Sequence, residues 1–445
     1  MNFGQETLLR KLAELADLAG RPGRYVIALS GGLDSTVLTH ALATASDAHS
    51  TPVLAVYVDH GLQKESAAWS SHCAAFAATL DIDFLSVRAD VDERSGQGPE
   101  AAARDARYAA LQALLQAGDW LLSAHHKDDQ AETLLLNLMR GSGPAGLAGI
   151  AEVRPFSLGW LVRPLLSVSR TELQNYAVEN KLAWIDDPSN QDRQFDRNYL
   201  RHEVMPRLEA RWPEVASRLK RSAMLAGEAA QMLDQLADAD LQTLGDRPDR
   251  LALEALRALS SERQRNVLRY VVRELGMPSP PAAQLRSIVT DLIPARDDAS
   301  PVVEWQGAAV RRYRDNVYVL AAAGRDADVA SPQSVTDGHV QLAAGLGELS
   351  LEPGASSGLA EKVVAQGLEV RYRSGGEEIQ PLGRSHTRKL KKLLQEEGIV
   401  PWMRDRLPLL YSAGQLVAVG DLWIAADAAS EPGTAVRWQN RPAIH

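Results

Sequence analysis

The chain of 445 residues has 45% hydrophobic and 24% charged residues, which is ordinary for a soluble globular protein, and its length predicts about three domains. A single cysteine, Cys73, excludes an internal disulfide and any mechanism that needs two cysteines of this chain, and it fits a reducing cytoplasm. The sequence shows no signal-peptide pattern and no apolar run long enough to cross a membrane, and its net charge of −9 argues against a nucleic-acid partner unless basic residues cluster.

The first third of the chain alternates short apolar runs with helical patterns. We expect buried strands at residues 25–29, 53–58, 84–87 and 120–123, and helices at 36–43, 66–80, 100–115 and 131–139. Continuous apolar strands separated by helices are typical of a parallel sheet that is covered on both faces. The sequence therefore predicts a doubly wound α/β domain whose ligands bind beyond the carboxyl ends of the strands.

The rest of the chain changes character twice. Residues 152–200 are more irregular and are punctuated by Pro155, Pro164 and Pro188. Helical patterns follow at 215–244, 251–259, 262–275 and 282–292, then strands within 302–320, a linker-like composition at 324–338, and short strands with one helix near 389–397. We expect an α/β domain at 1–213, a mainly helical domain at 214–324 and a small α+β domain at 325–445.

A glycine-rich loop connects the first predicted strand to the first predicted helix. It consists of Ser30, Gly31, Gly32, Leu33, Asp34 and Ser35. Glycines let backbone N–H groups curl around an anion, and the helix N-terminus adds unpaired donors. Asp34 is unusual beside phosphates unless it holds Mg²⁺. The alternative is a serine-capped turn, which the strand–loop–helix context disfavours, and the missing Gly-Lys-Ser/Thr excludes the phosphate loop of kinases.

A second polar string follows the fourth predicted strand, where such a sheet places its active site. Its candidate acids and bases are His125, His126, Asp128, Asp129 and Glu132. The carboxylates suit a cationic substrate. The alternative is that Asp129 and Glu132 form a capping box at a helix start and that the histidines are satisfied polar residues. One carboxylate can also serve both purposes.

Basic residues cluster in three places despite the acidic balance. Arg104 and Arg107 share one face of a predicted helix, where they can meet phosphates or remain a solvated basic face. Two larger clusters contain Arg193, Arg197, Arg201, His202, Arg207 and Arg211, and Arg384, His386, Arg388, Lys389, Lys391, Lys392, Arg404 and Arg406 with Trp402. Basic groups beside an aromatic ring suit unstacked RNA bases, whereas the alternative is again a solvated surface.

Several strings in a fixed order resemble one enzyme family. Besides SGGLDS (30–35) and HHKDDQAET (125–133), they are VDHGL (58–62), EAAARDARY (100–108), RGSG (140–143), RPLL (163–166), DPSN (187–190) with RNYLR (197–201), and KKLLQE (391–396) with PWMRD (401–405). The loop alone resembles the PP-loop of the N-type ATP pyrophosphatase superfamily. The whole set resembles the tRNA(Ile)-lysidine synthases within it.

The resemblance implies a reaction and a set of roles. It implies that ATP, with Mg²⁺, adenylates the wobble cytidine of a CAU anticodon in tRNA(Ile), that AMP and pyrophosphate are released, and that free lysine is coupled to C2. Residues 30–35 would bind ATP, Asp34 would hold the metal, and Asp34, His125, Asp128, Asp129 and Glu132 would be catalytic. Asp129, Glu132 and Arg104 would bind lysine, and Arg197, Arg201, Arg388, Lys389, Lys391, Lys392, Trp402 and Arg404 would bind tRNA.

Three other interpretations compete with this one. A tRNA thiolase could use the same loop, but sulfur transfer usually needs more cysteines than Cys73, which we expect in a helix as a small core residue. A small-molecule ligase fits the basic C-terminal region poorly, and a non-catalytic RNA module fits the retained acids poorly. A homodimer is left open.

Overall fold

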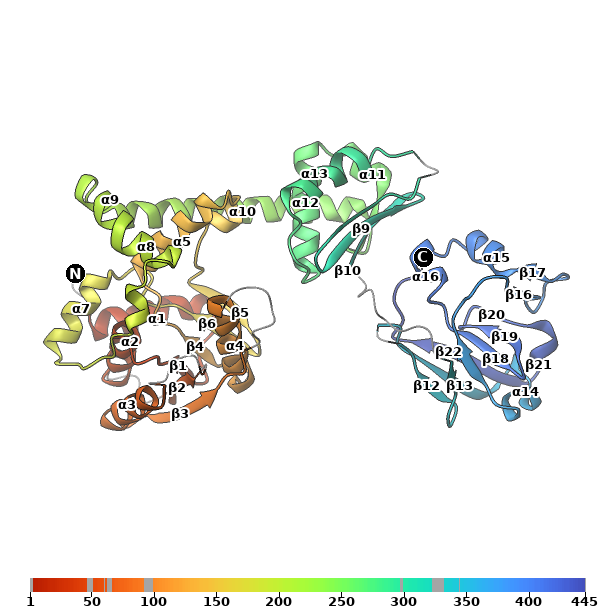
Figure 1. The fold of residues 1–445 in the computed structure, drawn as a ribbon, viewed down its shortest axis with the longest axis horizontal. Coiled ribbons are helices and arrows are strands. Elements are labelled where there is room, and N and C mark those ends of the chain that lie inside the picture. Colours follow the sequence, from red (N-terminus) through yellow and green to blue (C-terminus); the bar gives the residue numbers. More distant parts are fainter. Residues whose placement is uncertain are drawn as a thin grey trace. The chain divides into compact units, whose positions relative to one another are not determined.

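A computed structural model describes residues 3–45, 51–59, 61, 66–91, 99–296, 299–321, 332–343 and 345–444 (Figure 1). The chain divides into two compact units, Met1–Leu233 and Asp234–His445. His60 and Leu62 of the VDHGL string, and residues 324–331 of the expected linker, lie outside the described residues. Within the described ranges, no helix is long and apolar enough to cross a bilayer.

The first unit is built on a six-stranded sheet with the order β3-β2-β1-β4-β6-β5. Five strands are parallel, namely β1 (Tyr25–Ala28), β2 (Val53–Asp59), β3 (Asp83–Arg88), β4 (Trp120–Leu122) and β6 (Gly159–Val162), and β5 (Val153–Phe156) is antiparallel to β6. The predicted parallel sheet is confirmed. Strands β5 and β6 fall in the region expected to be irregular; Pro155 is tolerated there because β5 is an edge strand.

Helices cover both faces of this sheet because successive strand residues point to opposite sides. Ile27 of β1 packs with α1 (Gln5–Ala19), α2 (Leu33–Ala43) and α7 (Arg170–Glu179), and α3 (Ser66–Thr79) packs beside them through Cys73. Val26 of β1 instead packs with α4 (Pro99–Leu114) through Leu111. The doubly wound arrangement is therefore confirmed, and Cys73 is the buried core residue that the sequence indicated.

The strand order changes direction between β1 and β4, which lie side by side in the sheet although they are far apart in sequence. In doubly wound sheets, ligands bind in the crevice at this point, beyond the carboxyl ends of the strands. The glycine-rich loop follows β1, and the histidine–aspartate string follows β4. The fold therefore brings the two predicted site segments together.

Short helices complete the first unit. They are α5 (Lys127–Met139), α6 (Pro144–Leu147), the 3₁₀ turn η2 (Pro188–Gln191), α8 (Asp196–Tyr199), the π-helical turn η3 (Leu200–Val204) and α9 (Met205–Arg211). The long helix α10 (Val215–Leu244) runs from this unit into the second.

The first half of the second unit is helical with one small sheet. It contains α11 (Leu253–Ala258), α12 (Ser261–Glu274), α13 (Ala282–Ser287) and the π-helical turn η4 (Ile288–Leu292). The antiparallel sheet β7-β10-β9-β8 consists of β7 (Arg250–Ala252), β8 (Val302–Trp305), β9 (Ala308–Tyr313) and β10 (Asn316–Ala321). Helix α12 buries Val267, Leu268 and Val271, the spacing of one helix face, against this sheet.

The second half is β-rich, as expected for an α+β domain. One sheet contains β11 (Gln333–Ser334), β15 (Glu369–Arg371), β18 (Leu409–Ser412), β19 (Gln415–Val419) and β20 (Trp423–Ile424). Another contains β12 (His339–Gln341), β13 (Glu348–Ala355), β22 (Gly433–Gln439), β14 (Gly358–Leu359) and β21 (Ala429–Ser430). The remaining elements are β16 (Glu378–Ile379), β17 (Arg388–Lys389), α14 (Glu361–Ala365), α15 (Leu390–Glu396), α16 (Pro401–Arg404) and the 3₁₀ turn η5 (Ala426–Ala428).

Candidate active site

Hydrogen bonds between its own serines stabilise the glycine-rich loop. The Ser30 and Ser35 hydroxyl oxygens lie 3.0 Å apart, and the Ser30 backbone N–H donates to Ser35 Oγ at 3.2 Å. Ser35 Oγ in turn donates to the Gly32 carbonyl at 3.1 Å. Helix α2 starts at Leu33, so its first N–H groups have no partner within the helix and face the loop. Such a loop is suited to bind an anion with backbone donors.

Gly31 cannot be replaced by a larger residue without strain. Its φ of +81° lies in the left-handed region that favours glycine. A Cβ added there would lie 2.7 Å from Ile185 Cδ1 and 3.0 Å from Cys73 Sγ. The Gly31 carbonyl also accepts a hydrogen bond from the Ile185 backbone N–H at 2.8 Å. The loop therefore takes its shape from a close fit to the buried Cys73 and the half-buried Ile185.

His126 lies at the centre of three carboxylates. Its Nε2 is 3.7 Å from Asp34 Oδ2 and 3.5 Å from Asp129 Oδ2, and its Nδ1 is 3.4 Å from Asp128 Oδ2. Burial by itself lowers the pKa of this imidazole, but Asp128, Asp129 and Asp34 outweigh burial and raise the pKa above its ordinary value. His126 thereby joins the loop after β1 to the start of α5.

Asp34 is the loop residue that carries an unsatisfied group. Its Oδ1 is buried and has no hydrogen-bond partner among the described residues. Burial raises the pKa of this carboxyl, and the nearby Asp129 raises it further, whereas His126, Arg170 and Arg201 oppose the increase. An anionic oxygen without a protein partner at the mouth of a phosphate loop fits a hard cation. Asp34 is thus brought to the other predicted acids.

Asp129 and Glu132 are paired with two arginines from a distant segment. Asp129 Oδ1 accepts from Arg197 at 2.9 Å and from Arg201 at 3.1 Å. Glu132 accepts from Arg197 Nε at 2.8 Å and from Arg201 Nε at 2.7 Å, and its side chain is 2% exposed. Burial raises the pKa of Asp129, but His126 and Arg197 outweigh it and lower the pKa to about 2. The four side chains form one charge-balanced cluster.

The sequence associated these arginines with tRNA and did not pair them with the acids. The pairing joins residues 65–72 positions apart, through α8 and η3. The signal that could have revealed it is spacing: Arg197 and Arg201 are four residues apart, and Asp129 and Glu132 are three apart, so each pair occupies one helix face. Arg170 was also missed; its backbone N–H donates to Asp128 Oδ2 at 2.9 Å.

The prediction that Asp129 and Glu132 form a capping box was correct for Asp129 and wrong for Glu132. Helix α5 starts at Lys127, four residues before the predicted start, and its N-cap is His126. Asp129 Oδ2 accepts the His126 backbone N–H at 2.9 Å, so Asp129 occupies the third helical position of the capping box. Glu132 does not cap the helix. Asp129 therefore caps with one oxygen and binds arginine with the other.

The charged neighbours of His125 differ from those of His126 and include three arginines. Its Nδ1 lies 2.7 Å from Ser123 Oγ. Burial, with Arg163, Arg197 and Arg107 nearby, lowers the pKa of His125 to about 3, although Asp129 opposes this. A group with so low a pKa is neutral and weakly basic at neutral pH. His126 rather than His125 is therefore the histidine that contacts the acids.

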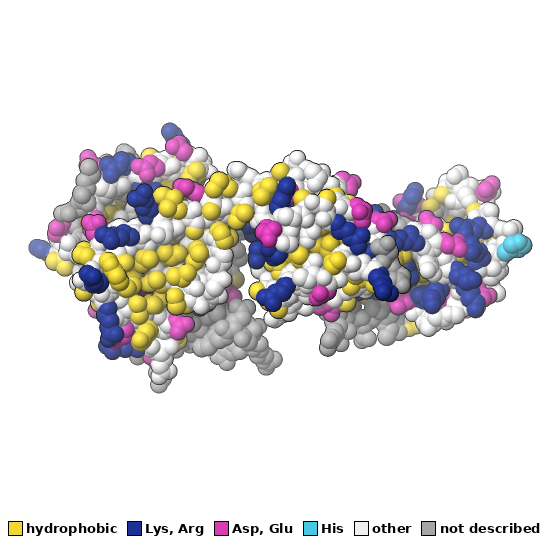
Figure 2. Space-filling view, turned by 90° about the horizontal axis from the view of Figure 1, so that it is seen from above, with side chains coloured by type: hydrophobic (Ala, Val, Ile, Leu, Met, Phe, Trp, Pro, Cys, Tyr) yellow, Lys and Arg dark blue, Asp and Glu magenta, His cyan; other side chains and the backbone are white. Residues whose placement is uncertain are grey.

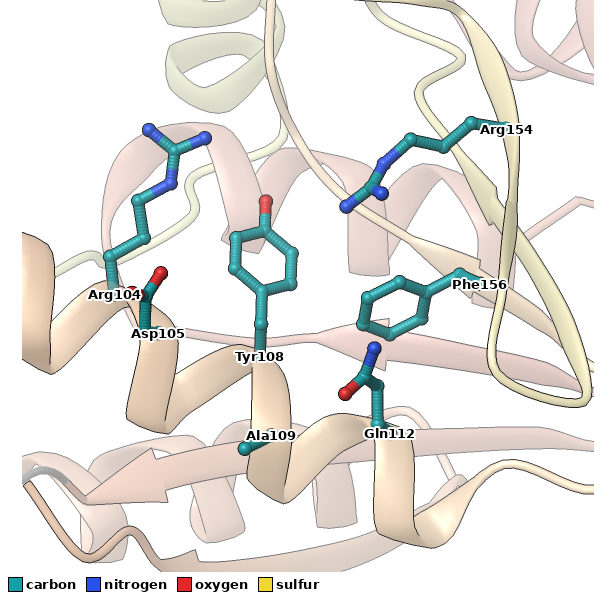
Figure 3. A pocket seen from close by; sticks show the side chains of 7 residues that line it. All are labelled: Arg104, Asp105, Tyr108, Ala109, Gln112, Arg154 and Phe156. Carbon is teal, nitrogen blue, oxygen red and sulfur yellow. The ribbon is translucent and has the colours of Figure 1, made fainter. Parts of the chain in front are cut away.

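Arg104 lies in a different environment from Asp129 and Glu132. It lines a surface hollow with Asp105, Tyr108, Ala109, Gln112, Arg154 and Phe156 (Figure 3). Its guanidinium carbon is 5.8 Å from the centre of the Tyr108 ring. No hydrogen bond or ion pair joins Arg104 to either acid in the described part of the chain.

The predicted tRNA residues of the second unit separate into two groups. Lys389, Lys391 and Lys392 are exposed, and Lys and Arg side chains gather near the right-hand end of Figure 2. The other three make contacts within the unit. Arg388 pairs with Glu396 at 2.6 Å, the Trp402 ring meets Tyr318 edge-on at 5.0 Å, and Arg404 donates to the Tyr313 hydroxyl at 2.7 Å.

Comparison with known families divides the chain into three matching parts. Residues 5–208 match the model of a PP-loop domain, residues 251–318 match the TilS substrate binding domain, and residues 368–439 match the TilS substrate C-terminal domain. The first match contains the whole site described above. Along the chain, the three matches fall in turn on the α/β domain, on the helical region with its small sheet and on the β-rich region.

Named relatives match over nearly the whole chain. A tRNA(Ile)-lysidine synthase of Alkalilimnicola ehrlichii is 44% identical, over 96% of this chain and 95% of that protein. Those of Methylococcus capsulatus and Coxiella burnetii are 42% and 39% identical, over 92% and 94% of this chain and 94% and 92% of the relatives. With such identity across all three matching parts, the chain belongs to the tRNA(Ile)-lysidine synthase family.

Proposed function

We propose that the chain is a ligase that joins lysine to C2 of the wobble cytidine of tRNA(Ile) with a CAU anticodon, and that it converts ATP to AMP and pyrophosphate. The observation that carries this proposal is the contact of the glycine-rich loop with the acids of α5 through His126. A nucleotide-binding loop beside buried carboxylates fits adenylation followed by attack of an amine. Family membership supports the same reaction.

ATP is the substrate that the loop holds. Residues 30–35 cradle its phosphates with backbone N–H groups, and the start of α2 adds a favourable dipole. Asp34 would hold Mg²⁺, because its buried Oδ1 has no partner among the described residues. Mg²⁺ in nucleotide sites is usually bound by one or two carboxylates together with substrate phosphates, so a single carboxylate such as Asp34 suits it. When bound, the cation neutralises phosphate charge.

The reaction proceeds in two displacements. The cytidine O2 attacks the α-phosphorus, so an O–P bond forms and the bond between the α- and β-phosphates breaks, with pyrophosphate leaving. The lysine side-chain amine then attacks C2, so a C–N bond forms and the C–O bond breaks, with AMP leaving. The amine has an ordinary pKa near ~10.4 and must lose a proton before it can attack. Asp34, Asp128, Asp129, Glu132 and His125 are the proposed catalytic residues around this step.

Lysine is recognised by charge. Asp129 and Glu132 would receive an ammonium group, and Arg104 would receive the carboxylate. Both acids already accept hydrogen bonds from Arg197 and Arg201. An ammonium group of lysine must therefore either share the two carboxylates with the guanidinium groups or displace a guanidinium group from them. Arg197 and Arg201 thereby become a link between the amino-acid site and the tRNA surface to which we also assign them.

tRNA is held by all three parts of the chain. We assign 1–213 to catalysis and 214–324 and 325–445 to tRNA binding, with Lys389, Lys391 and Lys392 as exposed phosphate contacts. Arg388, Trp402 and Arg404 complete that surface and also stabilise the unit through the contacts described above. A tRNA substrate supports a location in the cytoplasm. A thiolase is disfavoured because the chain has one cysteine, and Cys73 is buried with a pKa raised by burial to about 12.

The decisive experiment supplies ATP, Mg²⁺ and radiolabelled lysine with tRNA(Ile) bearing a CAU anticodon. We expect label to enter the tRNA only when its wobble nucleotide is cytidine, with one AMP released for each lysine. Asp34→Ala abolishes AMP release, and Asp129→Ala raises the KM for lysine much more than the KM for ATP. Modification that requires a sulfur donor, or tRNA binding without AMP release, would contradict the proposal.

A further inference from the structure

Arg170 is a half-buried arginine that starts α7 at the active site. Its backbone N–H donates to Asp128 Oδ2 at 2.9 Å, and this oxygen also lies 3.4 Å from His126 Nδ1. The backbone of Arg170 is thereby tied to the start of α5. Its guanidinium group has no hydrogen-bond or ion-pair partner among the described residues, in contrast to those of Arg197 and Arg201. This side chain is therefore available to a substrate group.

Helices α2 and α7 pack against each other and run in the same direction, with both starts at the active site. Near the starts, burial raises the pKa of the Asp34 carboxyl, and Arg170 is one of the nearby cations that oppose this increase. Six residues farther along each helix, His40 Nδ1 lies 3.0 Å from the Tyr176 hydroxyl oxygen. The equal offset in the two helices shows that they are parallel. Since a helix start carries positive partial charge, both ends favour an anion here.

The start of α7 offers the arginine side chain rather than its backbone. The Glu172 N–H donates to Ser169 Oγ at 3.3 Å, and the Ser169 N–H donates to Glu172 Oε2 at 2.8 Å. With the Arg170 N–H bound to Asp128, three N–H groups at this end already have acceptors. An anion beside Asp34 would therefore meet the guanidinium group, whose fork of donors matches a phosphate with two parallel hydrogen bonds.

The neighbours of Arg170 indicate which part of ATP it meets. Burial raises the pKa of Asp129, and His126 and Arg197 are the cations that lower it most strongly, whereas Arg170 acts on Asp34. The cytidine approaches the α-phosphorus from the side of Asp129, because the lysine that later attacks it is bound there. Since the attacking and leaving oxygens lie roughly in line, pyrophosphate leaves on the opposite side. That side belongs to the glycine-rich loop, Asp34 and Arg170.

We propose that the Arg170 guanidinium group binds the β- and γ-phosphates of ATP and stabilises the pyrophosphate that leaves. When the cytidine O2 attacks the α-phosphorus, the bond from this phosphorus to the bridging oxygen breaks, and its electron pair stays on pyrophosphate. Arg170 offsets this added charge by donating hydrogen bonds, and no proton is transferred. A cation already in place for the developing charge lowers the barrier. The inference rests on the proposed function and adds one catalytic residue to it.

The test compares Arg170→Ala with Arg10→Ala. Arg10 is an exposed arginine of α1, so both variants lose one positive charge. Titration calorimetry of the full chain measures the binding of pyrophosphate, of AMP, and of an ATP analogue with a methylene group between its α- and β-phosphorus atoms. We expect Arg170→Ala to weaken binding of pyrophosphate and of the analogue about 10- to 100-fold, as for the loss of a hydrogen bond to a charged group. Binding of AMP, which lacks these phosphates, stays unchanged, and Arg10→Ala binds all three as the wild type does.

Turnover and a conservative variant separate this role from a structural one. Arg170→Ala should lower kcat for AMP release with the KM for lysine unchanged, and Arg170→Lys, which keeps the charge but loses the fork, should recover part of the pyrophosphate affinity. The inference is overturned if the two alanine variants bind pyrophosphate equally, if Arg170→Ala loses AMP affinity to the same extent, or if Arg170→Lys recovers nothing. Wild-type protein that binds pyrophosphate and the analogue but releases no AMP with tRNA would overturn the proposed function instead.

Discussion

Glu132 pairs with both Arg197 and Arg201, and its neutralisation gives a sharp prediction. The carboxylate is almost fully buried and accepts three hydrogen bonds, one from Arg197 and two from Arg201. Glu132→Gln keeps the shape of the side chain but removes its charge. The two guanidinium groups are then left with Asp129 as their sole carboxylate partner among the described residues.

The size of the effect follows from burial. Removing one partner of a buried ion pair costs about 3–5 kcal/mol because the remaining charge is uncompensated. Arg197 and Arg201 have side chains 30% and 21% exposed and keep Asp129, so we expect the lower end, about 3 kcal/mol. For a unit of this length each kcal/mol lowers the Tm by about 2–4 °C, which gives a decrease of about 6–12 °C.

Calorimetry of the full chain measures this decrease in the transition of the first unit. Glu179→Gln is the matched control, since Glu179 ends α7 and is exposed, and we expect its Tm to match that of the wild type. A Glu132→Gln transition within 1 °C of the control, as an order-of-magnitude threshold, would refute the claim that the ion pairs stabilise this unit.

Three other predictions follow from the site. Gly31→Ala should abolish ATP turnover because the added Cβ would collide with Ile185. Gly23→Ala should leave turnover intact, because the atom nearest to its added Cβ is 4.0 Å away. Equal losses of turnover in the two variants would contradict the role of loop shape. The folded pKa of Asp129 is about 2 against 3.8 ordinarily, so its contribution of about 2 kcal/mol is present above pH ~5 and is lost as pH falls toward 2. The Tm difference between wild type and Asp129→Asn should therefore shrink below pH ~4; a difference independent of pH would contradict this assignment. Changing Lys391 and Lys392 to Ala should weaken tRNA binding and lower its salt slope by about two, and an unchanged slope would remove them from the interface.

The elements around β1 and β4 could be predicted because their signals are local. Tyr25–Ala28 belongs to an apolar run that is followed, after Ser30, by two glycines and a helix, so strand, loop and helix start are visible together. The start of α5 was placed four residues late because Lys127, Asp128 and Asp129 look polar throughout. They are nonetheless helical, because Asp129 caps the helix through the His126 backbone.

The partners of the acids could not be predicted because they depend on long-range packing. Nothing local to Arg197 of α8 or Arg201 of η3 indicates that these side chains reach Glu132, since basic residues spaced along a helix are usually solvated. The same holds for Trp402, whose ring packs against Tyr318 from a strand more than eighty residues earlier. Strand β5 was missed because Pro155 normally interrupts a strand, whereas the edge position of β5 tolerates it.

The central claim is that the loop after β1 grips a nucleotide cleaved between its α- and β-phosphates. The most direct measurement incubates the protein with CAU tRNA(Ile) and ATP radiolabelled at the α-phosphate, without lysine, and then adds unlabelled lysine. The account predicts that label becomes attached to the tRNA and leaves as AMP when lysine is added, while Gly31→Ala transfers none. Release of ADP and orthophosphate, or tRNA that never carries the α-label, would contradict it.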